Sequence, residues 1–501
     1  MIFLIQKKKM KRIKNLLIAN RGEIALRIIQ ACRELDISPF VIYSESDKDS
    51  LACKAADKAF FVGKSNPQLS YLNLPKIIKI AKKNNVDAIH PGYGFLSESP
   101  LFPKVCKEEG IIFVGPPARV MRQMGLKIEA KRLAQKLGIP VVPGSEGLVD
   151  SVESAKKVIK RMGLPVMIKA SAGGGGRGMR VVNRIDELEK AFYLSKSEAN
   201  ESFGDDSVYI EKYIKKPRHV EVQILGDNFG NVVHLFEREC SVQRNHQKLI
   251  EEAPCPVLSE EERKRITSYA VRIAKAIGYR SAGTVEFIMD YSRNIYFNEM
   301  NTRIQVEHGI TELITGIDIV KEQIRISSGF PVSFKQRDVR IFGHAFECRI
   351  NAENPKKNFE GSFGRITNYS APKGIGLRLD TFIEKGTLIT PFYDSLIAKL
   401  MSFGRDRNEA LGRMLFFLNQ FIVEGIETNL EMHRLIFKNK GFIKADLSTD
   451  FVKDNRILET LKKKEKPQEL LDVALIAATI NEFYKKEQTK ELDSWVLSSR
   501  T

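Results

Sequence analysis

The sequence VMIKASAGGGGRGMRVV, residues 166–182, decides the fold of the central part of the chain. Four consecutive glycines lie between two short runs of residues that are typical of β-strands. A loop with so few Cβ atoms can bring its backbone N–H groups close to an anion, although ordering it costs conformational entropy. The stretch therefore predicts a strand, a flexible flap that covers phosphates, and a second strand.

Two better-known glycine loops do not fit this context. A P-loop ends in Gly-Lys-Ser/Thr and opens a helix, and the dinucleotide-binding glycine motif also opens a helix. Here Met179, Val181 and Val182 follow the glycines and favour a strand. Lys169 ends the first strand and would direct a cation at the same phosphates. This stretch alone leaves an ordinary glycine-rich hairpin turn as the alternative.

Composition limits the class of protein. The 501 residues are 43% hydrophobic, enough for a large core in roughly two to four domains. No apolar run approaches the roughly 20 residues of a membrane span, and the N-terminal MIFLIQKKKMKRIK reverses the order of a secretory signal. Six cysteines without a CxxC pair favour a reducing compartment. We expect a cytoplasmic protein without a membrane partner, starting at Met1 or Met10.

The net charge of +18 comes from 80 basic and 62 acidic residues. A nucleic-acid-binding protein has such a balance, but no basic motif interleaved with aromatic residues occurs here. Anionic small substrates or an acidic partner protein explain the charge equally well.

The N-terminal part alternates between strands and amphipathic helices. Strands are predicted at residues 16–19, 40–43, 88–90 and 111–114, and helices at 23–35, 74–84 and 102–109. This pattern predicts a parallel sheet with helices on both faces. The loop HPGYGFLSE, residues 90–98, follows a strand, where open α/β sheets place ligands, although its glycines serve turn geometry equally well. A helical connector over residues 118–137 carries Lys127.

A second polar constellation is NIYFNEMNTRIQVEH, residues 294–308. If its strand continues with period two, five polar side chains share one face: Glu299, Asn301, Arg303, Gln305 and Glu307. A solvated strand face is the simple alternative, but Glu286 is a further carboxylate within a β-type run. Glu286, Glu299 and Asn301 offer hard oxygen ligands for magnesium. Arg303 could clamp an oxyanion, and Glu307 could act as a base.

Residues 208–214 are predicted to form a strand that leads out of the flap region and serves as a hinge. Downstream, ERECSVQRNHQKLIEEAP, residues 237–254, concentrates polar side chains. A lone histidine is more often structural than catalytic. His246 differs because its neighbours are polar and cationic.

Six motifs in this order resemble those of biotin carboxylase, the ATP-grasp component of biotin-dependent carboxylases. They are IANRGEIA (18–25), HPGYGFLSE (90–98), IKASAGGGGRGMR (168–180), ECSVQRNHQK (239–248), EMNTRIQVEH (299–308) and ECRINAE (347–353). Their joint occurrence is more specific than any single motif. The resemblance implies an α/β (α+β overall) ATP-grasp fold with an N-terminal doubly wound, Rossmann-like domain, a lid domain and a C-terminal biotin carboxylase domain.

The resemblance also implies how the chain is divided. We expect an N-terminal extension (1–10), a biotin carboxylase N-terminal domain (11–125), a helical linker (126–141), a lid with the glycine flap (142–214), the ATP-grasp core with the C-terminal domain (215–445) and a C-terminal extension (446–501). The extension is predicted to have helical stretches at 456–463 and 469–487 around a charged KKKEK break.

The roles implied for the nucleotide side of the site concern ATP and Mg²⁺ or Mn²⁺. Lys127, Lys169 and His246 would contact the phosphates under the flap glycines Gly174, Gly175, Gly176 and Gly178. Glu211, Lys212 and the backbone of Ile214 would contact adenine, and His219 and Gln243 the ribose. Glu286, Glu299 and Asn301 would hold the metal.

The roles implied for the other side concern bicarbonate and biotin. Lys248, Arg303, Gln305 and the Val306 N–H would bind bicarbonate, and Glu307 would deprotonate it. Arg349 would stabilise the biotin enolate, with Tyr93 and Asp394 nearby. The implied reaction carboxylates carrier-bound biotin through carboxyphosphate, with phosphate taking the ureido proton.

Some features depart from the family pattern. Gly309 stands where proline usually follows VEH and is expected to loosen the loop of Glu307, and Leu126 replaces a polar residue. Gln30 replaces an expected arginine in the first helix, so the homodimer is a weaker prediction than catalysis.

No Met-Lys-Met biotinylation motif or carboxyltransferase segment occurs. We therefore expect a separate biotin carboxyl carrier protein and a separate carboxyltransferase, with the acceptor (acetyl-CoA, pyruvate, propionyl-CoA or 2-oxoglutarate) left open. Two alternatives remain from other classes: another ATP-grasp ligase, such as a carboxylate–amine ligase or a carbamoyl phosphate synthase module, and a nucleic-acid-binding protein. The first would not need Arg349, and the second leaves the polar constellation without a role.

Overall fold

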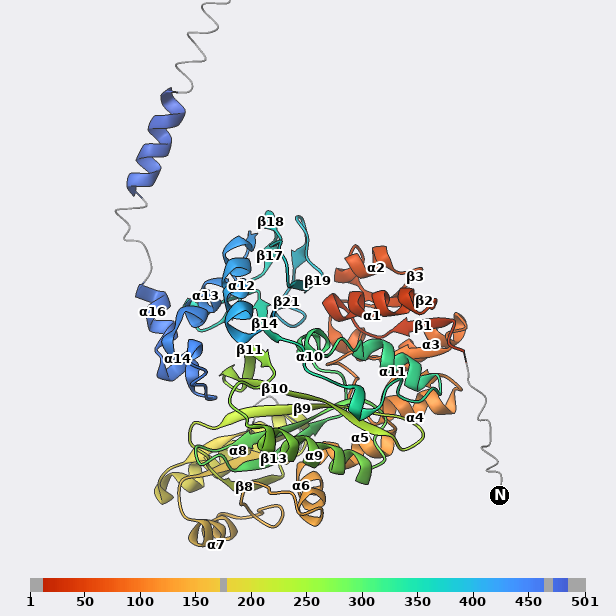
Figure 1. Cartoon of the computed structure of the whole chain (residues 1–501), viewed down its shortest axis with the longest axis vertical. Helices are drawn as coiled ribbons and strands as arrows, with labels where there is room; N and C mark the ends of the chain where they lie inside the picture. The colour runs from red at the N-terminus through yellow and green to blue at the C-terminus, as the bar shows by residue number, and fades with distance from the viewer. Residues whose placement is uncertain (1–11, 172–177, 464–471, 485–501) are drawn as a thin grey trace, which may run out of the picture.

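The computed structural model describes residues 12–171, 178–463 and 472–484 (Figure 1). Its N-terminal part is a parallel sheet in the order β3-β2-β1-β4-β5. The strands are β1 (Asn15–Ile18), β2 (Ser38–Ser44), β3 (Lys58–Gly63), β4 (Ala88–His90) and β5 (Ile112–Phe113), and the helices are α1 (Gly22–Glu34), α2 (Leu51–Ala55), α3 (Leu74–Lys83) and α4 (Leu101–Glu108). The predicted α/β unit is confirmed.

Alternate residues of β1 explain why helices cover both faces of this sheet. Leu16 and Ile18 join the core cluster that contains Ile24 of α1, whereas Leu17 joins the cluster of Ile77 on α3. Side chains alternate across a strand, so a short apolar strand is buried on both sides.

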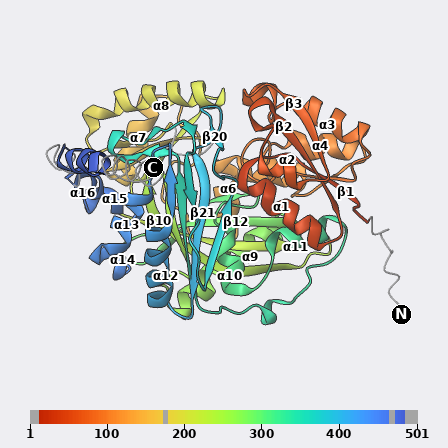
Figure 2. The ribbon, with the colours of Figure 1, turned by 90° about the horizontal axis from the view of Figure 1, so that it is seen from above.

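The glycine stretch lies in a small antiparallel sheet of order β7-β6-β8. Its strands are β6 (Val166–Ala170), β7 (Arg180–Val182) and β8 (Val208–Lys212), and its helices are α7 (Val152–Met162) and α8 (Leu188–Phe203). Strands flank the glycines on both sides, as predicted, which excludes a P-loop. Seen from above, these helices and the N-terminal sheet occupy opposite sides of the molecule (Figure 2).

An eight-stranded antiparallel sheet, of order β13-β12-β9-β10-β11-β14-β21-β19, forms the body. Its strands are β9 (Arg218–Gly226), β10 (Val232–Arg244), β11 (Gln247–Ala253), β12 (Ser281–Met289), β13 (Ile295–Asn301), β14 (His344–Asn351), β19 (Leu377–Thr381) and β21 (Leu396–Gly404). Three of the six sequence motifs contribute strands to this sheet, which therefore carries most of the site.

The other elements cover the body or extend it. The helices are α9 (Glu260–Ala276), α10 (His308–Thr315), α11 (Ile319–Ser327), α12 (Arg407–Gln420), α13 (Leu430–Lys438), α14 (Lys440–Ile443), α15 (Phe451–Asp454) and α16 (Ile457–Lys463), with a further helix at 472–484. The short strands are β15 (Glu353–Asn354), β16 (Glu360–Gly361), β17 (Gly364–Arg365), β18 (Asn368–Ser370), β20 (Leu388–Ile389) and β22 (Ile422–Glu424). Within the described residues, no helix combines the length and apolar character needed to cross a membrane.

Two predicted elements are wrong in detail. The connector is two helices, α5 (Ala118–Gly125) and α6 (Lys127–Lys136), because Leu126 between them has an extended backbone. The polar strand ends at Asn301, so Arg303, Gln305 and Glu307 lie in a loop. The β12–β13 pairing stops at Thr284 and Asn301, because the next N–H group of the chain, that of Thr302, donates to Glu98 and not to β12.

Candidate active site

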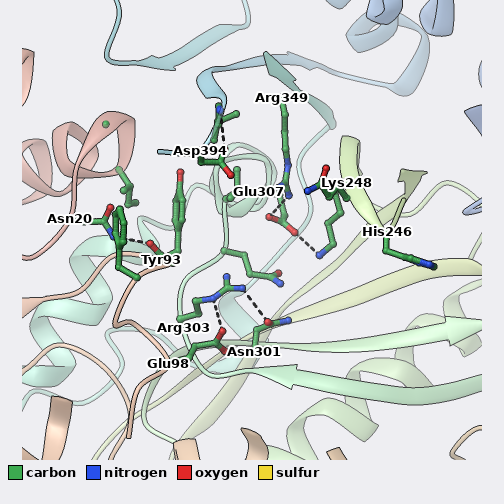
Figure 3. Close-up of a pocket in the computed structure, with 18 of the residues that line it drawn as sticks. Asn20, Tyr93, Glu98, His246, Lys248, Asn301, Arg303, Glu307, Arg349 and Asp394 are labelled. Atoms are coloured by element: carbon green, nitrogen blue, oxygen red, sulfur yellow. Dashed lines mark hydrogen bonds and ion pairs between the residues drawn. The ribbon is translucent and has the colours of Figure 1, made fainter. Parts of the chain in front are cut away.

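A cavity of about 840 Å³ lies where the N-terminal domain meets the large sheet (Figure 3). Its lining includes most of the residues that the sequence singled out: Tyr93, Lys127, His219, His246, Lys248, Glu286, Glu299, Asn301, Arg303, Gln305, Val306, Glu307, Arg349 and Asp394. The other described residues among those predicted do not line it, namely Lys169, Gly178, Glu211, Lys212 and Ile214 of the lid and hinge and Gln243 of β10. Gly174, Gly175 and Gly176 lie outside the described residues.

Glu307 is the centre of the ion-pair network in the cavity. It directly precedes α10 and is only 1% exposed. Its Oε1 accepts from Lys248 Nζ at 2.7 Å, and its Oε2 accepts from Arg349 Nη2 at 2.9 Å. Burial acts to raise the pKa of Glu307, but Lys248, Arg349 and Arg238 outweigh it and hold the pKa well below 4.5. The carboxylate is therefore ionised, and its two contacting cations suppress its basicity.

Lys248 connects Glu307 to the large sheet. Its ammonium lies 2.5 Å from a Glu221 oxygen on β9 and 3.0 Å from Glu286 on β12. Arg238 of β10 is fully buried and holds Glu221 from the other side, with its Nε donating at 2.6 Å. The Nη groups of Arg238 donate to Gln223, Thr284, Gln305 and Thr311. Arg238 thus fixes Gln305 directly, and it fixes Lys248 through Glu221.

Arg349 enters the cavity from β14. Its Nε donates to Glu251 Oε1 at 2.6 Å, and its Nη2 lies 2.5 Å from the same oxygen besides donating to Glu307. Glu251 on β11 and Glu347 on β14 are paired across the two strands. Burial raises the pKa of Glu251 to about 7 and that of Glu347 well above 4.5. Two buried carboxyl groups therefore lie behind the guanidinium.

The proposed metal ligands lie on neighbouring strands. Glu286 of β12 and Glu299 of β13 are cross-strand partners, and Asn301 Nδ2 donates to Glu286 Oε1 at 2.8 Å. Lys127 Nζ lies 3.1 Å from Glu299 Oε2. Two carboxylates and an amide oxygen are the hard donors that Mg²⁺ takes when it also binds nucleotide phosphates. The residues present therefore fit that ion.

Arg303 is held at another wall of the cavity by Glu98 of the HPGYGFLSE loop. Its Nε donates to Glu98 Oε2 at 3.0 Å, and its Nη2 donates to Asn301 Oδ1 at 3.2 Å (Figure 3). The Thr302 N–H donates to the other oxygen of Glu98 at 3.1 Å. Glu98 thus turns the chain away from the sheet directly after β13, yet Arg303 still faces the cavity.

Asn20, from the IANRGEIA motif, fixes the HPGYGFLSE loop. Its Nδ2 donates to the carbonyl oxygens of Pro91 and Tyr93, both at 2.7 Å. Gly92 has φ of +62°, and a Cβ there would lie 2.8 Å from Asn20 Nδ2, so a side chain does not fit. The Tyr93 hydroxyl donates to Glu23. This glycine serves turn geometry, while the loop as a whole contributes Tyr93 and Glu98 to the cavity.

On the nucleotide side, Lys169 of β6 and Lys131 of α6 both contact Glu211 of β8, with Lys169 Nζ at 2.7 Å. The sequence analysis did not single out Lys131. Lys212 Nζ donates to the carbonyl oxygens of residues 162–164 at 3.0 to 3.4 Å, so its ammonium is engaged at the end of α7. Gly178, with φ of +67°, leaves room for Ala170, whose Cβ would lie 3.0 Å from an added Cβ.

The remaining predicted residues gather at the β10–β11 hairpin and β9. Asn245 and His246 have φ of 47° and 64° and connect the paired residues Arg244 and Gln247, as in a two-residue hairpin turn with positive φ at both positions. Burial, and next Lys169, lower the pKa of His246. His219 Nδ1 lies 2.8 Å from Gln243 Nε2, so the two predicted ribose contacts are neighbours.

Gly309 packs closely instead of loosening the loop of Glu307. It is the second residue of α10, and a Cβ there would lie 2.5 Å from Met401 Sδ on β21. Met401 is fully buried and fills the space that a side chain would need. The glycine therefore lets α10 approach the sheet directly after Glu307.

Three family models match consecutive parts of the chain. They describe the biotin carboxylase N-terminal domain (residues 12–121), the carbamoyl-phosphate synthase L chain ATP binding domain (127–335) and the biotin carboxylase C-terminal domain (347–454). Biotin carboxylase 1 of Bacillus subtilis is 50% identical over 441 residues, covering 88% of this chain and 98% of that protein. The chain belongs to the biotin carboxylase family.

Further relatives agree with this membership. The 2-oxoglutarate carboxylase small subunit of Hydrogenobacter thermophilus is 45% identical over 472 residues, covering 94% of this chain and 99% of that subunit. The crystal structure of the biotin carboxylase domain dimer of the same organism's 2-oxoglutarate carboxylase, in complex with MgADP, ADP and bicarbonate, has a TM-score of 0.87 at 46% identity. The match covers 89% of this chain and 98% of that domain.

The resemblance, the ATP-grasp fold and the enzyme class predicted from sequence are confirmed. The chain is an ATP-dependent ligase of the biotin carboxylase type. The ATP-binding model alone would also fit other ATP-grasp ligases, but the two biotin carboxylase models that flank it distinguish this family from them.

Sequence reasoning missed several side chains that contact residues of the site: Glu98, Lys131, Glu221, Arg238 and Glu251. It also missed Glu347, a buried carboxyl group paired with Glu251 across the strands. A signal existed for three of them, because Glu221, Glu251 and Glu347 are carboxylates within β-type runs, the criterion that singled out Glu286. Arg238 carries no such signal in the local sequence, since its role depends on strands far apart in the chain.

Proposed function

We propose that the chain carboxylates biotin on a separate biotin carboxyl carrier protein, using ATP and bicarbonate, as the first half-reaction of a multi-subunit carboxylase. The observation that carries the proposal is Glu307 in contact with both Lys248 and Arg349. One base thereby touches the cation assigned to bicarbonate and the cation assigned to biotin. The relative crystallised with MgADP and bicarbonate supports the same substrates.

Lys127, Lys169 and His246 bind the ATP phosphates in this proposal, with the glycine flap over them. Glu286, Glu299 and Asn301 hold Mg²⁺ or Mn²⁺, since both ions accept such oxygen ligands. The ion supplies positive charge beside the phosphates when it is bound. Lys127 and Lys169 exchange their present contacts with Glu299 and Glu211 for contacts with phosphate oxygens. Glu211, Lys212 and Ile214 contact adenine, and His219 and Gln243 contact the ribose.

Lys248, Arg303, Gln305 and the Val306 N–H bind bicarbonate, and Glu307 takes its proton. A carbonate oxygen then attacks the γ-phosphorus, and the bond to ADP breaks to leave carboxyphosphate. This compound breaks down to CO₂ and phosphate, the phosphate takes the ureido N–H proton of biotin, and the biotin nitrogen attacks CO₂. Exclusion of water from the cavity during the reaction would protect the labile intermediate.

The low pKa of Glu307 fits a base that is switched on by its substrates. Lys248 and Arg349 lower its proton affinity while they contact it. When Lys248 turns to bicarbonate and Arg349 to the biotin oxygen, this stabilisation of the carboxylate weakens, and its pKa rises. Glu307 thus becomes basic when the reactants are in position.

Arg349 holds the enolate oxygen of biotin, with Tyr93 and Asp394 beside it in the cavity. The partners are the carrier protein and a separate carboxyltransferase chain. The dimeric relative supports a homodimer, although Gln30 is engaged with Glu34 on its own helix at 3.1 Å. The unpaired cysteines among the described residues fit a reducing, cytoplasmic location.

The test is transfer of radiolabelled bicarbonate to free biotin by the purified chain with ATP and magnesium. Acid-labile carboxybiotin is expected, and none should form without ATP. ATP-dependent labelling of an amine or ammonia, with none of biotin, would contradict the proposal and indicate another ATP-grasp ligase.

A further inference from the structure

The helix at residues 472–484, here called the tail helix, carries an apolar stripe. Val473, Ile476, Ile480 and Phe483 recur at spacings of three, four and three residues, the pattern of a helix that packs against another helix. Every residue of the tail helix is exposed, and its large apolar side chains are 50 to 62% exposed. A contiguous exposed apolar face of this kind marks an interaction site.

The described part of the tail helix, residues 472–484, would be only marginally stable by itself. Isolated helices below roughly 12 to 15 residues are marginal in water, so most of their stability comes from packing of the apolar face. Eight residues, 464–471, connect it to α16, and they can span at most about 29 Å. Its partner surface therefore lies close to the C-terminal part of the body, near α16 (Figure 1).

The comparisons separate two possible occupants of the stripe. The crystallised H. thermophilus domain is a dimer, and the match covers 98% of it but only 89% of this chain. That relative therefore dimerises without a counterpart to most of the C-terminal extension. The full small subunit matches 94% of this chain, which reaches beyond α16, whereas B. subtilis biotin carboxylase 1 matches 88%. Part of the extension is thus shared with that small subunit of a carboxylase.

We propose that the apolar stripe of the tail helix docks in an apolar, helix-lined groove of the separate subunit that carries the carboxyltransferase, and joins the two subunits. This inference rests on the proposed function, which requires such a second chain. The short connection to α16 would let the catalytic body move relative to its partner while both remain in one complex, which a carrier that visits two sites needs.

The test is co-expression of the full chain with the carboxyltransferase subunit of its holoenzyme, followed by co-purification. Ile476→Asp/Ile480→Asp puts two charges in the stripe. Leu475→Asp/Ala478→Asp puts two charges on the opposite side of the same helix and is the matched control. We expect the amount of carboxyltransferase subunit that co-purifies with the first variant to fall at least about tenfold, because docking would bury two charges. The control variant should retain the normal amount.

Three outcomes would overturn the docking inference: retention of the partner by the stripe variant, equal loss by both variants, or a change in the oligomeric state of the chain alone. The last would mean that a second copy covers the stripe. Free-biotin-dependent ATP hydrolysis should be unchanged in both variants. If the unmodified chain lacks that activity, the proposed function fails, whatever the docking result.

A second, independent observation concerns the carboxyl groups behind Arg349. Its Nε and Nη2 both lie against Glu251 Oε1, and Nη2 also reaches Glu307. Among the described residues, no hydrogen bond engages Nη1. Glu251 and Glu307 therefore hold the guanidinium through Nε and Nη2, and Nη1 remains to donate to a ligand.

Glu347 provides the comparison within the same strand pair. It is as deeply buried as Glu251, yet neither of its oxygens has a hydrogen-bond partner in the described parts of the chain. Because burial keeps Glu347 protonated, a glutamine there would preserve both its size and its charge. Glu251, by contrast, contacts Arg349 directly.

We propose that Glu251 is the positioning residue that aims Arg349 at the oxygen of biotin. Without it, Glu307 is the remaining direct acceptor, and the guanidinium would move onto the base. That movement would withdraw the donor from biotin and further suppress the basicity of Glu307.

The test compares the KM for free biotin with the KM for ATP. We expect Glu251→Ala to raise the biotin KM about tenfold, as loss of a charged hydrogen bond does, with the ATP KM unchanged. Glu251→Gln, which keeps the shape and one acceptor, should cause a smaller rise confined to biotin. Glu347→Gln should change neither value. Equal effects of the Glu251 and Glu347 variants, or a matching rise in the ATP KM, would overturn the assignment.

Discussion

The two sides of the proposed site hold their cations differently. On the bicarbonate and biotin side, Lys248 contacts three carboxylates, Glu221, Glu286 and Glu307. These residues, with Arg349, are set by adjacent strands of one sheet and the loop that enters α10. Their charges are therefore oriented before any substrate binds, which is how proteins stabilise charge that develops during a reaction.

On the nucleotide side each lysine has a single carboxylate partner. Lys127 contacts Glu299, and Lys169 contacts Glu211. These residues belong to separate elements, namely the connector, the large sheet and the lid. In the proposed mechanism, proton transfer therefore takes place among groups that one sheet brings together before the substrates bind, whereas phosphate binding depends on contacts between separate elements.

Removing the base should have the largest effect. Glu307→Gln keeps the shape of the site but cannot accept the bicarbonate proton, so bicarbonate-dependent turnover should fall at least about a hundredfold. ATP binding, measured by calorimetry, should persist because the lysines of the nucleotide side are untouched. A near-normal rate would contradict the base assignment.

Removing the biotin-side cation should come next. Arg349→Ala should lower biotin carboxylation about thirtyfold through loss of charge-assisted hydrogen bonds. The KM for ATP should stay close to that of the unmodified chain in the same assay. A loss of ATP affinity would instead assign Arg349 to the nucleotide half and remove the distinction between the halves.

A lysine of the nucleotide half should show the reverse pattern. Lys169→Ala should raise the KM for ATP about tenfold, since a single charged contact to phosphate is lost, and leave the KM for bicarbonate unchanged. Lys156→Ala, an exposed lysine on α7 of the same lid, is the control. An equal rise in the bicarbonate KM would mean that the two halves are not separable.

The smallest effect concerns stability and its dependence on pH. Burial raises the pKa of Glu347 well above 4.5, so between pH 4.5 and this raised pKa the folded chain holds a proton that the unfolded chain has released. The free energy of unfolding therefore falls as the pH rises through this range. Glu347→Gln has no proton to release and therefore removes this decrease in stability at high pH. Its melting temperature should exceed that of the unmodified chain by more at pH 8 than at pH 5. A constant difference between the two pH values would show that Glu347 is ionised.

The sequence predicted those parts of the site that depend on local pattern. Glu286 and Glu299 could be placed because carboxylates within apolar strands stand out, and the first parallel sheet followed from short apolar runs. The end of β13 could not be predicted, since it depends on Glu98, 204 residues from Thr302. The hydrogen bonds of buried Arg238 could not be predicted for the same reason, because their acceptors belong to several elements that are far apart in the sequence.

The central claim is that one site couples bicarbonate, ATP and biotin, and ATP hydrolysis by the purified chain tests it most directly. With magnesium and bicarbonate present, free biotin should stimulate hydrolysis, and the stimulation should disappear when bicarbonate is withheld. Hydrolysis that is indifferent to biotin would contradict the account.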